Sequence, residues 1–131
     1  MSHDVSPLAT PFPALPAIAG ATPRVARARY KEWDRCDLTY VELAPDTAVA
    51  GVFTQNRFCA APVQICRKHL AAGNEIRALV VNTGIANAGT GEPGRQAAQE
   101  TCEAVGELLG ISAGQVLPFS TGVILELLPV E

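Results

Sequence analysis

The sequence predicts an α+β protein, in which helices pack on a mixed or antiparallel sheet in a layered sandwich. Two observations support this prediction. Predicted strands outnumber predicted helices, and the elements do not follow the strict strand–helix alternation of a doubly wound α/β fold. The 131 residues are 48% apolar and 18% charged, which provides enough apolar surface for the core of one domain or part of a larger one.

Proline divides the chain near its beginning. Five of the ten prolines lie within residues 1–23, and proline fixes φ and removes an N–H donor. We therefore expect residues 1–23 to form an extended Pro/Ala-rich arm, and residues 24–131 to form the domain. The domain begins with a basic stretch, Arg24–Arg35. This stretch predicts a charged edge strand or surface loop, with a positive patch facing a substrate as the alternative.

The next region reads as short strands. Asp37–Leu43 is rich in β-forming residues and alternates in the manner of a strand. Pro45-Asp46 predicts a turn, and the apolar stretch Ala48–Thr54 predicts a second strand that completes a hairpin. We expect a third short strand at Pro62–Cys66 and a single helical turn at Arg67–Ala72.

The second half contains the clearest elements. Arg77–Asn82 predicts a buried strand, followed by a glycine-rich loop at Thr83–Gly91. Pro93–Leu109 predicts a helix, because proline suits a first turn and apolar residues recur on one face. Gly110 suits the position just after the helix.

The last region is predicted to be another strand and a turn. Gln115–Phe119 reads as a short strand. Ser120, Thr121 and Gly122 read as a sharp turn before the apolar residues that follow.

Composition excludes several classes of function. The chain has 10 basic and 13 acidic residues, a net charge of −3, and no evident basic face, so nucleic acid and anionic membranes are poor partners. No apolar run approaches the roughly 18 residues of a membrane span. The first residues lack the positive region of a secretory signal, and we expect a cytoplasmic protein. The four cysteines form no CxxC pair, which argues against a metal site.

Two local patterns are considered and set aside. Gly89–Gly94 matches GxGxxG, but the preceding strand ends too early and Pro93 removes a donor where a phosphate would need one. Dinucleotide binding is therefore not expected. Cys66 and His69 could share a helix face as a nucleophile and its base, but no third orienting group is evident nearby. A packing role is the favoured interpretation for this pair.

One pattern indicates acyl-transfer chemistry. In Pro118–Ile124, the hydroxyl of Thr121 lies next to the N–H of Gly122. Two adjacent donors of this kind can stabilise the negative oxygen of a tetrahedral intermediate, as an oxyanion hole does. On the residues alone, a plain turn between two apolar segments explains the same pattern, so both interpretations stay open.

Four stretches together resemble the ornithine acetyltransferase family, also called glutamate N-acetyltransferase or the bifunctional arginine biosynthesis family. They lie in the order and spacing of the N-terminal part of that family, and the resemblance runs from about Ile18 to the last residue. The four stretches are Val52–Asn56 with Ala60–Val63, Ala78–Gly84, Ala86–Gly91 and Leu117–Ile124.

The resemblance implies an acyltransferase of arginine biosynthesis with the N-terminal part of that family's fold. Members are precursors that cleave themselves before a threonine, which then carries the acetyl group. The acetyl group passes from N2-acetyl-L-ornithine to L-glutamate, without a cofactor, although some members accept acetyl-CoA as donor. The resemblance assigns Thr121 and Gly122 to the oxyanion hole. It also implies a β chain from the same precursor, in a heterotetramer of two α and two β chains.

This sequence also departs from the family pattern. The nucleophilic threonine belongs to a downstream motif, so no residue here is expected to be the nucleophile, and no substrate-binding residue can be assigned. Ile85 stands where the family usually has asparagine, and Leu127 where proline is common. The alternative hypothesis is a truncated, inactive remnant or a chain that only binds a partner. Alone, the 131 residues are expected to be inactive.

Overall fold

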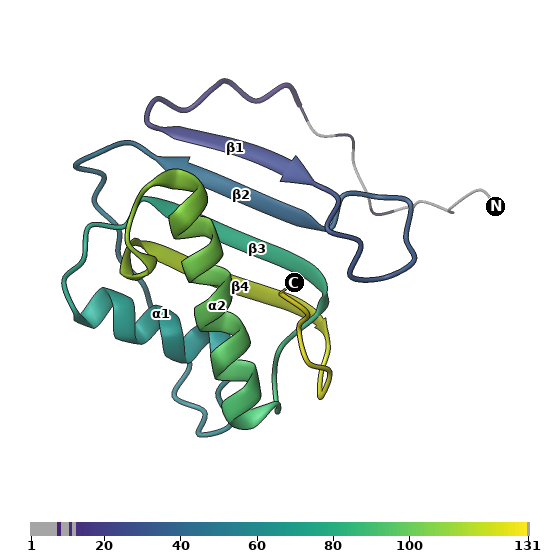
Figure 1. The fold of residues 1–131 in the computed structure, drawn as a ribbon. Coiled ribbons are helices and arrows are strands. Elements are labelled where there is room, and N and C mark those ends of the chain that lie inside the picture. The colour runs from purple at the N-terminus through teal and green to yellow at the C-terminus, as the bar shows by residue number, and fades with distance from the viewer. Residues whose placement is uncertain (1–7, 9–10, 12, 131) are drawn as a thin grey trace.

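The computed structural model describes residues 8, 11 and 13–130, and these form one four-stranded sheet with two α-helices (Figure 1). The spatial order of the strands is β1-β2-β3-β4, which is also their order in the chain. The strands are β1 (Ala21–Ala26), β2 (Leu38–Leu43), β3 (Ala78–Ile85) and β4 (Val116–Val123). The helices are α1 (Ala61–Ala71) and α2 (Gly91–Leu109), with a short 3-10 turn at Ala113–Gln115.

The sheet is mixed, as predicted. β1, β2 and β3 pair in antiparallel fashion, whereas β3 and β4 run parallel. Parallel neighbours need a crossover connection, and α2 supplies it. The molecule is therefore α+β with one β-α-β unit at one side of the sheet, where β4 is the edge strand.

Helix α2 covers one face of the sheet (Figure 1). Ala98 and Cys102 are buried against Ala78, Val80 and Val116 of the two parallel strands. The helix begins two residues before the predicted Pro93 and ends where predicted. Gly110 follows it with φ 66°, the left-handed conformation that favours glycine after a helix.

Helix α1 corrects the predicted strand at Pro62–Cys66. Pro62 lies in the first turn of the helix, where a missing N–H costs nothing. Ile65 and His69, one turn apart, are both buried. The buried residues therefore have a helical spacing, which a segment as short as 62–66 does not reveal. The predicted single turn at Arg67–Ala72 is the second half of this helix.

The predicted strand at Ala48–Thr54 is also wrong, although the turn at Pro45-Asp46 is present. β2 already has β1 and β3 as its two neighbours, so no place remains beside it for a hairpin partner. The segment instead leaves the sheet, and Val49 and Phe53 pack against the buried residues Leu43, Cys66, Ile76 and Leu117.

Residues 8, 11 and 13–20 are exposed. The predicted boundary at residue 23 falls inside β1, an edge strand with little burial, where Pro23 is tolerated. Residues 1–7, 9–10 and 12 of the predicted arm lie outside the described residues. Neither helix is long and apolar enough to cross a bilayer within the part of the chain that is described.

Candidate active site

The segment predicted as a turn, Ser120–Gly122, is instead the second half of β4. It pairs in parallel with Asn82, Thr83 and Gly84, so β3 also extends further than predicted, into the loop expected at Thr83–Gly91. Both strands carry the dipeptide Thr-Gly just before their last residue, and the two copies lie in register. Each Thr-Gly dipeptide alone predicts a turn, but side by side the two continue the parallel pairing of β3 and β4.

Successive residues of β4 direct their backbone groups alternately toward β3 and toward the open edge. Val123 O accepts a hydrogen bond from Ala86 N (2.8 Å), so Val123 faces β3. Pro118 O accepts from Cys66 Sγ (3.2 Å) on α1, so Pro118 faces the outer edge. Gly122, an even-numbered residue like Pro118, therefore directs its N–H to the outer edge.

The outer edge of β4 is covered only in its first half. His69 Nδ1 lies 2.8 Å from Val116 O. Because a carbonyl only accepts, the Nδ1–H of His69 donates this bond. Together with Cys66, this contact closes the edge at Val116 and Pro118. Thr121 and Gly122 lie beyond α1 and are exposed.

Glycine is required where the two strands end. Gly84 has φ 110° and Gly122 has φ 129°, both in the region that side chains rarely adopt. A Cβ built on Gly122 would overlap the backbone atoms of Gly84. The exposed end of β4 therefore lies directly against the backbone of its neighbour, which fixes its position.

A polar contact links the same strand ends on the side of α2. The hydroxyl of Ser120 donates to Asn82 Oδ1 (2.6 Å), and Asn82 Nδ2 donates to Ile85 O (2.8 Å). Asn82 is 4% exposed, so these bonds satisfy an amide that would otherwise be costly to bury.

Ile85, the first departure from the family pattern, is buried against Ala97 and Leu128. Its apolar side chain therefore serves packing, whereas Leu127, the second departure, is exposed.

The chain turns back immediately after β4. Leu125 has φ 65°, unusual for a branched side chain, and its N–H donates to Ala88 O (2.8 Å). This turn brings the carboxylate of Glu126 to the ammonium group of Lys31, with which it forms an ion pair. The strand end is thus held from both sides.

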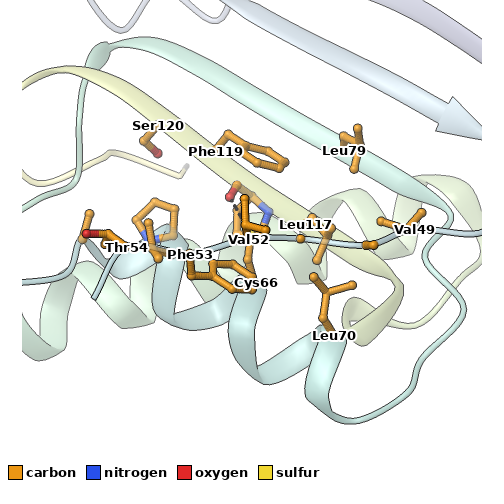
Figure 2. A pocket seen from close by; sticks show the side chains of 16 residues that line it. Val49, Val52, Phe53, Thr54, Cys66, Leu70, Leu79, Leu117, Phe119 and Ser120 are labelled. Carbon is orange, nitrogen blue, oxygen red and sulfur yellow. Dashed lines mark hydrogen bonds between the residues drawn. The ribbon is translucent and has the colours of Figure 1, made fainter. Parts of the chain in front are cut away.

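An apolar groove of about 450 Å³ lies next to Ser120, on the face of the sheet opposite α2. Figure 2 shows side chains converging on it from the Val49–Thr54 segment, α1 and β4. Phe53, Leu70 and Leu117 are among the lining residues, and the exposed Phe119 lies at the groove. This cavity contains few polar groups and gives no chemistry of its own.

The alternative pair, Cys66 and His69, has a structural role. Burial raises the pKa of the Cys66 thiol to about 11, so the thiol stays protonated at neutral pH. Both side chains bond to carbonyls of β4 rather than to one another. The pair therefore lacks the reactive thiolate of a cysteine nucleophile, and the packing interpretation holds.

The GxGxxG pattern is also structural. A Cβ on Gly94 would overlap Thr90 Oγ1, which donates to Asn87 Oδ1 (2.8 Å). Asn87 is fully buried and donates to Gly94 O (2.8 Å). The space at the start of α2 is therefore filled by the chain itself. Among the described residues, no group of three or more His, Cys, Asp or Glu could hold a metal ion.

The sequence predicted Thr121 and Gly122 as site residues, and this stays a prediction, but it did not predict the residues that contact this end of the strand. These are Asn82, Gly84, Lys31 and Glu126. The repeated Thr-Gly dipeptide was the available signal for Gly84, since two such pairs after two apolar runs can lie side by side. Nothing in the sequence linked Lys31 to Glu126, which lie 95 positions apart.

Comparisons with known proteins place this geometry in context. Residues 23–131 match the ArgJ family. The chain is 38% identical to an ornithine acetyltransferase from Mycobacterium tuberculosis, solved in complex with ornithine, with a TM-score of 0.81. It is 32% identical to an arginine biosynthesis bifunctional protein from Bacillus halodurans, with a TM-score of 0.80. Each match covers 86% of this chain, which spans 61% and 58% of those two chains.

Proposed function

Because the chain belongs to the ArgJ family, we propose that it is part of an acyltransferase of arginine biosynthesis, in which Thr121 and Gly122 form the oxyanion hole. The reaction is acetyl transfer from N2-acetyl-L-ornithine to L-glutamate through a threonine acyl-enzyme. The nucleophilic threonine belongs to the remainder of the enzyme, outside this chain. The observation that carries the proposal is the exposed Thr121-Gly122 pair at the open end of β4.

The first half-reaction makes the acyl-enzyme. The threonine hydroxyl attacks the acetyl carbonyl carbon of acetylornithine, and its proton passes to the amine of that threonine, which acts as base. The carbonyl oxygen becomes a negative oxygen in a tetrahedral intermediate. Collapse of this intermediate breaks the amide bond, the leaving nitrogen takes the proton, and ornithine departs.

The second half-reaction repeats the same geometry. The amine of glutamate attacks the acetyl ester and gives up one proton to the threonine amine, while the ester carbonyl oxygen again becomes negative. Collapse breaks the ester bond, the threonine oxygen takes that proton from the threonine amine, and N-acetylglutamate departs. The same two donors serve both intermediates, because both place the negative oxygen at one position.

The backbone geometry supports the two donor roles. The N–H of Gly122 faces the open edge, where no neighbouring strand of the described chain competes for it. The adjacent residue, Thr121, is exposed and provides the hydroxyl. Such donors act best when fixed before the charge develops, and loss of one typically costs about 2.7–4 kcal/mol of transition-state stabilisation.

Several further properties are part of the proposal. The working enzyme pairs this chain with a β chain from the same precursor, in a heterotetramer of two α and two β chains. It functions in the cytoplasm, needs no cofactor, and accepts acetyl-CoA as an alternative donor if it shares that activity with some family members. Thr121 and Gly122 would contribute in the same way with either donor.

The test is Thr121→Val in an enzyme that carries this chain together with the remainder of the family fold. Valine keeps the shape of threonine and removes only the donor. We expect kcat for acetyl exchange between acetylornithine and glutamate to fall about 100-fold or more, while KM for acetylornithine changes less than about threefold.

Two matched variants serve as controls. Thr121→Ser keeps a hydroxyl and should retain most of the rate. Thr22→Val makes the same change on the exposed edge strand β1 and should leave kcat unchanged. A Thr121→Val enzyme within threefold of wild type would remove threonine from the oxyanion hole, and a wild-type enzyme without acetyl exchange would refute the activity itself.

A further inference from the structure

We propose that Lys31 is a positioning residue for the oxyanion hole: paired with Glu126, it holds the end of β4 so that the Gly122 N–H keeps its direction. This inference rests on the proposed function. It concerns two residues far from each other in the sequence, and neither belongs to the donor pair itself. Three observations carry it: the anchored loop, the packing on Gly84 and the ion pair with Glu126.

The loop that carries Lys31 is held by hydrogen bonds to a buried carboxylate. The carboxylate of Asp37, 3% exposed, accepts hydrogen bonds from the backbone N–H groups of Ala28 (2.6 Å) and Tyr30 (2.9 Å). Asp37 O also accepts from Thr83 N (2.9 Å) on β3. The loop is therefore attached to β3 beside the Thr-Gly end, and Lys31 follows directly after its last anchored residue.

The stem of Lys31 and the ring of Trp33 lie on Gly84. A Cβ built on Gly84 would lie 3.2 Å from Lys31 Cγ and 3.2 Å from Trp33 Cζ3. The guanidinium of Arg35 lies 4.1 Å from the centre of the Trp33 ring and stacks on it. Gly84 is thus enclosed on one side by this loop and on the other by Gly122.

The head of Lys31 reaches past Gly84 to the segment that follows Gly122. Its ammonium group pairs with the carboxylate of Glu126, and the two side chains are 27% and 43% exposed. Glu126 reaches this position because the chain reverses at Leu125, whose N–H bonds to Ala88 O. Lys31 therefore joins β3 and the segment after β4 in one contact.

This arrangement restrains the one strand end that α1 leaves uncovered. The bonds from α1 to the outer edge reach Pro118, and Gly122 further along is exposed, so we take the direction of its N–H to depend on β3 and on the chain after Gly122. The ion pair fixes that following chain. Because displacements of about 1 Å can cost up to 100-fold in rate, loss of this restraint should lower the rate without removing a substrate contact.

The experiment compares Lys31→Met and Glu126→Gln in the complete enzyme, that is, this chain with the remainder of the family fold. Each variant should lower kcat by about tenfold or more, while KM for acetylornithine and for glutamate stays within about threefold. Lys31→Arg keeps the charge and should retain most of the rate. The exchanged pair Lys31→Glu with Glu126→Lys should recover part of the rate lost by either single change.

Arg27→Met is the matched control. Arg27 lies four residues earlier and also forms an ion pair, with Asp34 at 2.5 Å, but those side chains are 54% and 93% exposed. This pair lies within the loop and does not reach β4. Its loss should leave kcat at the wild-type value, which separates the Lys31 effect from a general effect of lost charge.

Three outcomes would overturn the inference, and each is distinct from failure of the proposed function. Lys31→Met with unchanged kcat, in an enzyme that Thr121→Val impairs, would show that the donors need no such restraint. A rise in KM without loss of kcat, with Glu126→Gln silent, would make Lys31 a substrate contact. Ion pairs this exposed usually contribute little to stability, so no large fall in thermal stability is expected. A fall that fully accounts for the lost rate would instead make the pair structural.

Discussion

Gly84 and Gly122 show how a missing side chain can shape a site. Each has a positive φ, and each faces the other across the parallel pair at the end of the sheet. The neighbours that a methyl group on Gly122 would meet are backbone atoms, which cannot move aside as a flexible side chain can. Glycine is needed at position 122 for its backbone conformation and close packing, because it contributes no side-chain group.

Gly122→Ala should therefore be strongly destabilising. Alanine adds the cost of a positive φ, about 1–2 kcal/mol, and overpacking against Gly84, typically about 1–3 kcal/mol. Gly73→Ala is the matched control, because Gly73 has φ 71° but nothing lies within 4 Å of its added Cβ. Urea unfolding of both variants should show the larger loss for Gly122→Ala, and equal losses would contradict the close contact.

Among the elements, α1 has a role that its position explains. It lies along β4 and its side chains, rather than another strand, bond to the outward carbonyls of Val116 and Pro118. This covers one half of an edge strand and leaves the other half free. The division falls between Pro118 and Thr121, next to the proposed donors.

His69→Ala should weaken this attachment. It removes the imidazole donor of Val116 O and leaves only the weak Cys102 thiol donor (3.7 Å), so the loss should be about 0.5–1.5 kcal/mol, the typical net contribution of one hydrogen bond. His69→Asn can return a donor to nearly the same place, because the amide nitrogen corresponds in position to Nδ1, and should recover part of the loss. The free energies of unfolding of the two variants provide the measurement, and identical values would show that the bond contributes nothing.

The elements also show which predictions a sequence supports. The existence of the buried strand was predictable from its apolar run, although not its end, and α2 was predictable because it has a long, regular pattern with end signals at Pro93 and Gly110. The segments 48–54 and 62–66 were too short for their period to decide between strand and helix. The length of β4 depends on its pairing with β3, and no local pattern contains that information.

At the scale of the whole molecule, the two larger hydrophobic clusters lie on opposite faces of the sheet. The one under α2 contains Cys102, the one on the groove side contains Cys66, and a third, smaller cluster surrounds Ile85. The family resemblance singled out Thr121 and Gly122, and their role as an oxyanion pair stays a prediction. The contact between Lys31 and Glu126 could not be predicted, because these residues meet only after the chain has folded.

Stability should fall with rising pH above about 9. Burial raises the pKa of Cys66 to about 11 and that of Cys102 to about 12, against 9.0 for an unburied thiol. Between these values the unfolded chain releases protons that the folded chain keeps, so the folded state loses stability; each tenfold difference in proton affinity is worth about 1.4 kcal/mol. Below pH 9 both states are protonated and the effect disappears.

Chemical denaturation at pH 8 and pH 10.5 measures this effect. The difference in unfolding free energy between the two pH values should shrink in a variant with Cys66→Ser and Cys102→Ser, since serine does not titrate there. Cys36→Ser is the matched control, because Cys36 is exposed. A pH effect of the same size in all three proteins would assign it to other groups.

The half-covered edge of β4 has a consequence beyond catalysis. A strand edge with unpaired backbone groups can accept a strand from another molecule, and proteins usually prevent this with charge, proline or a bulge. Here Pro118 and α1 protect only the first half, and Ser120–Val123 contains no charged residue. The opening that leaves an amide free for an anion therefore also favours edge-to-edge association, so solubility and the proposed chemistry place opposite demands on the same four residues.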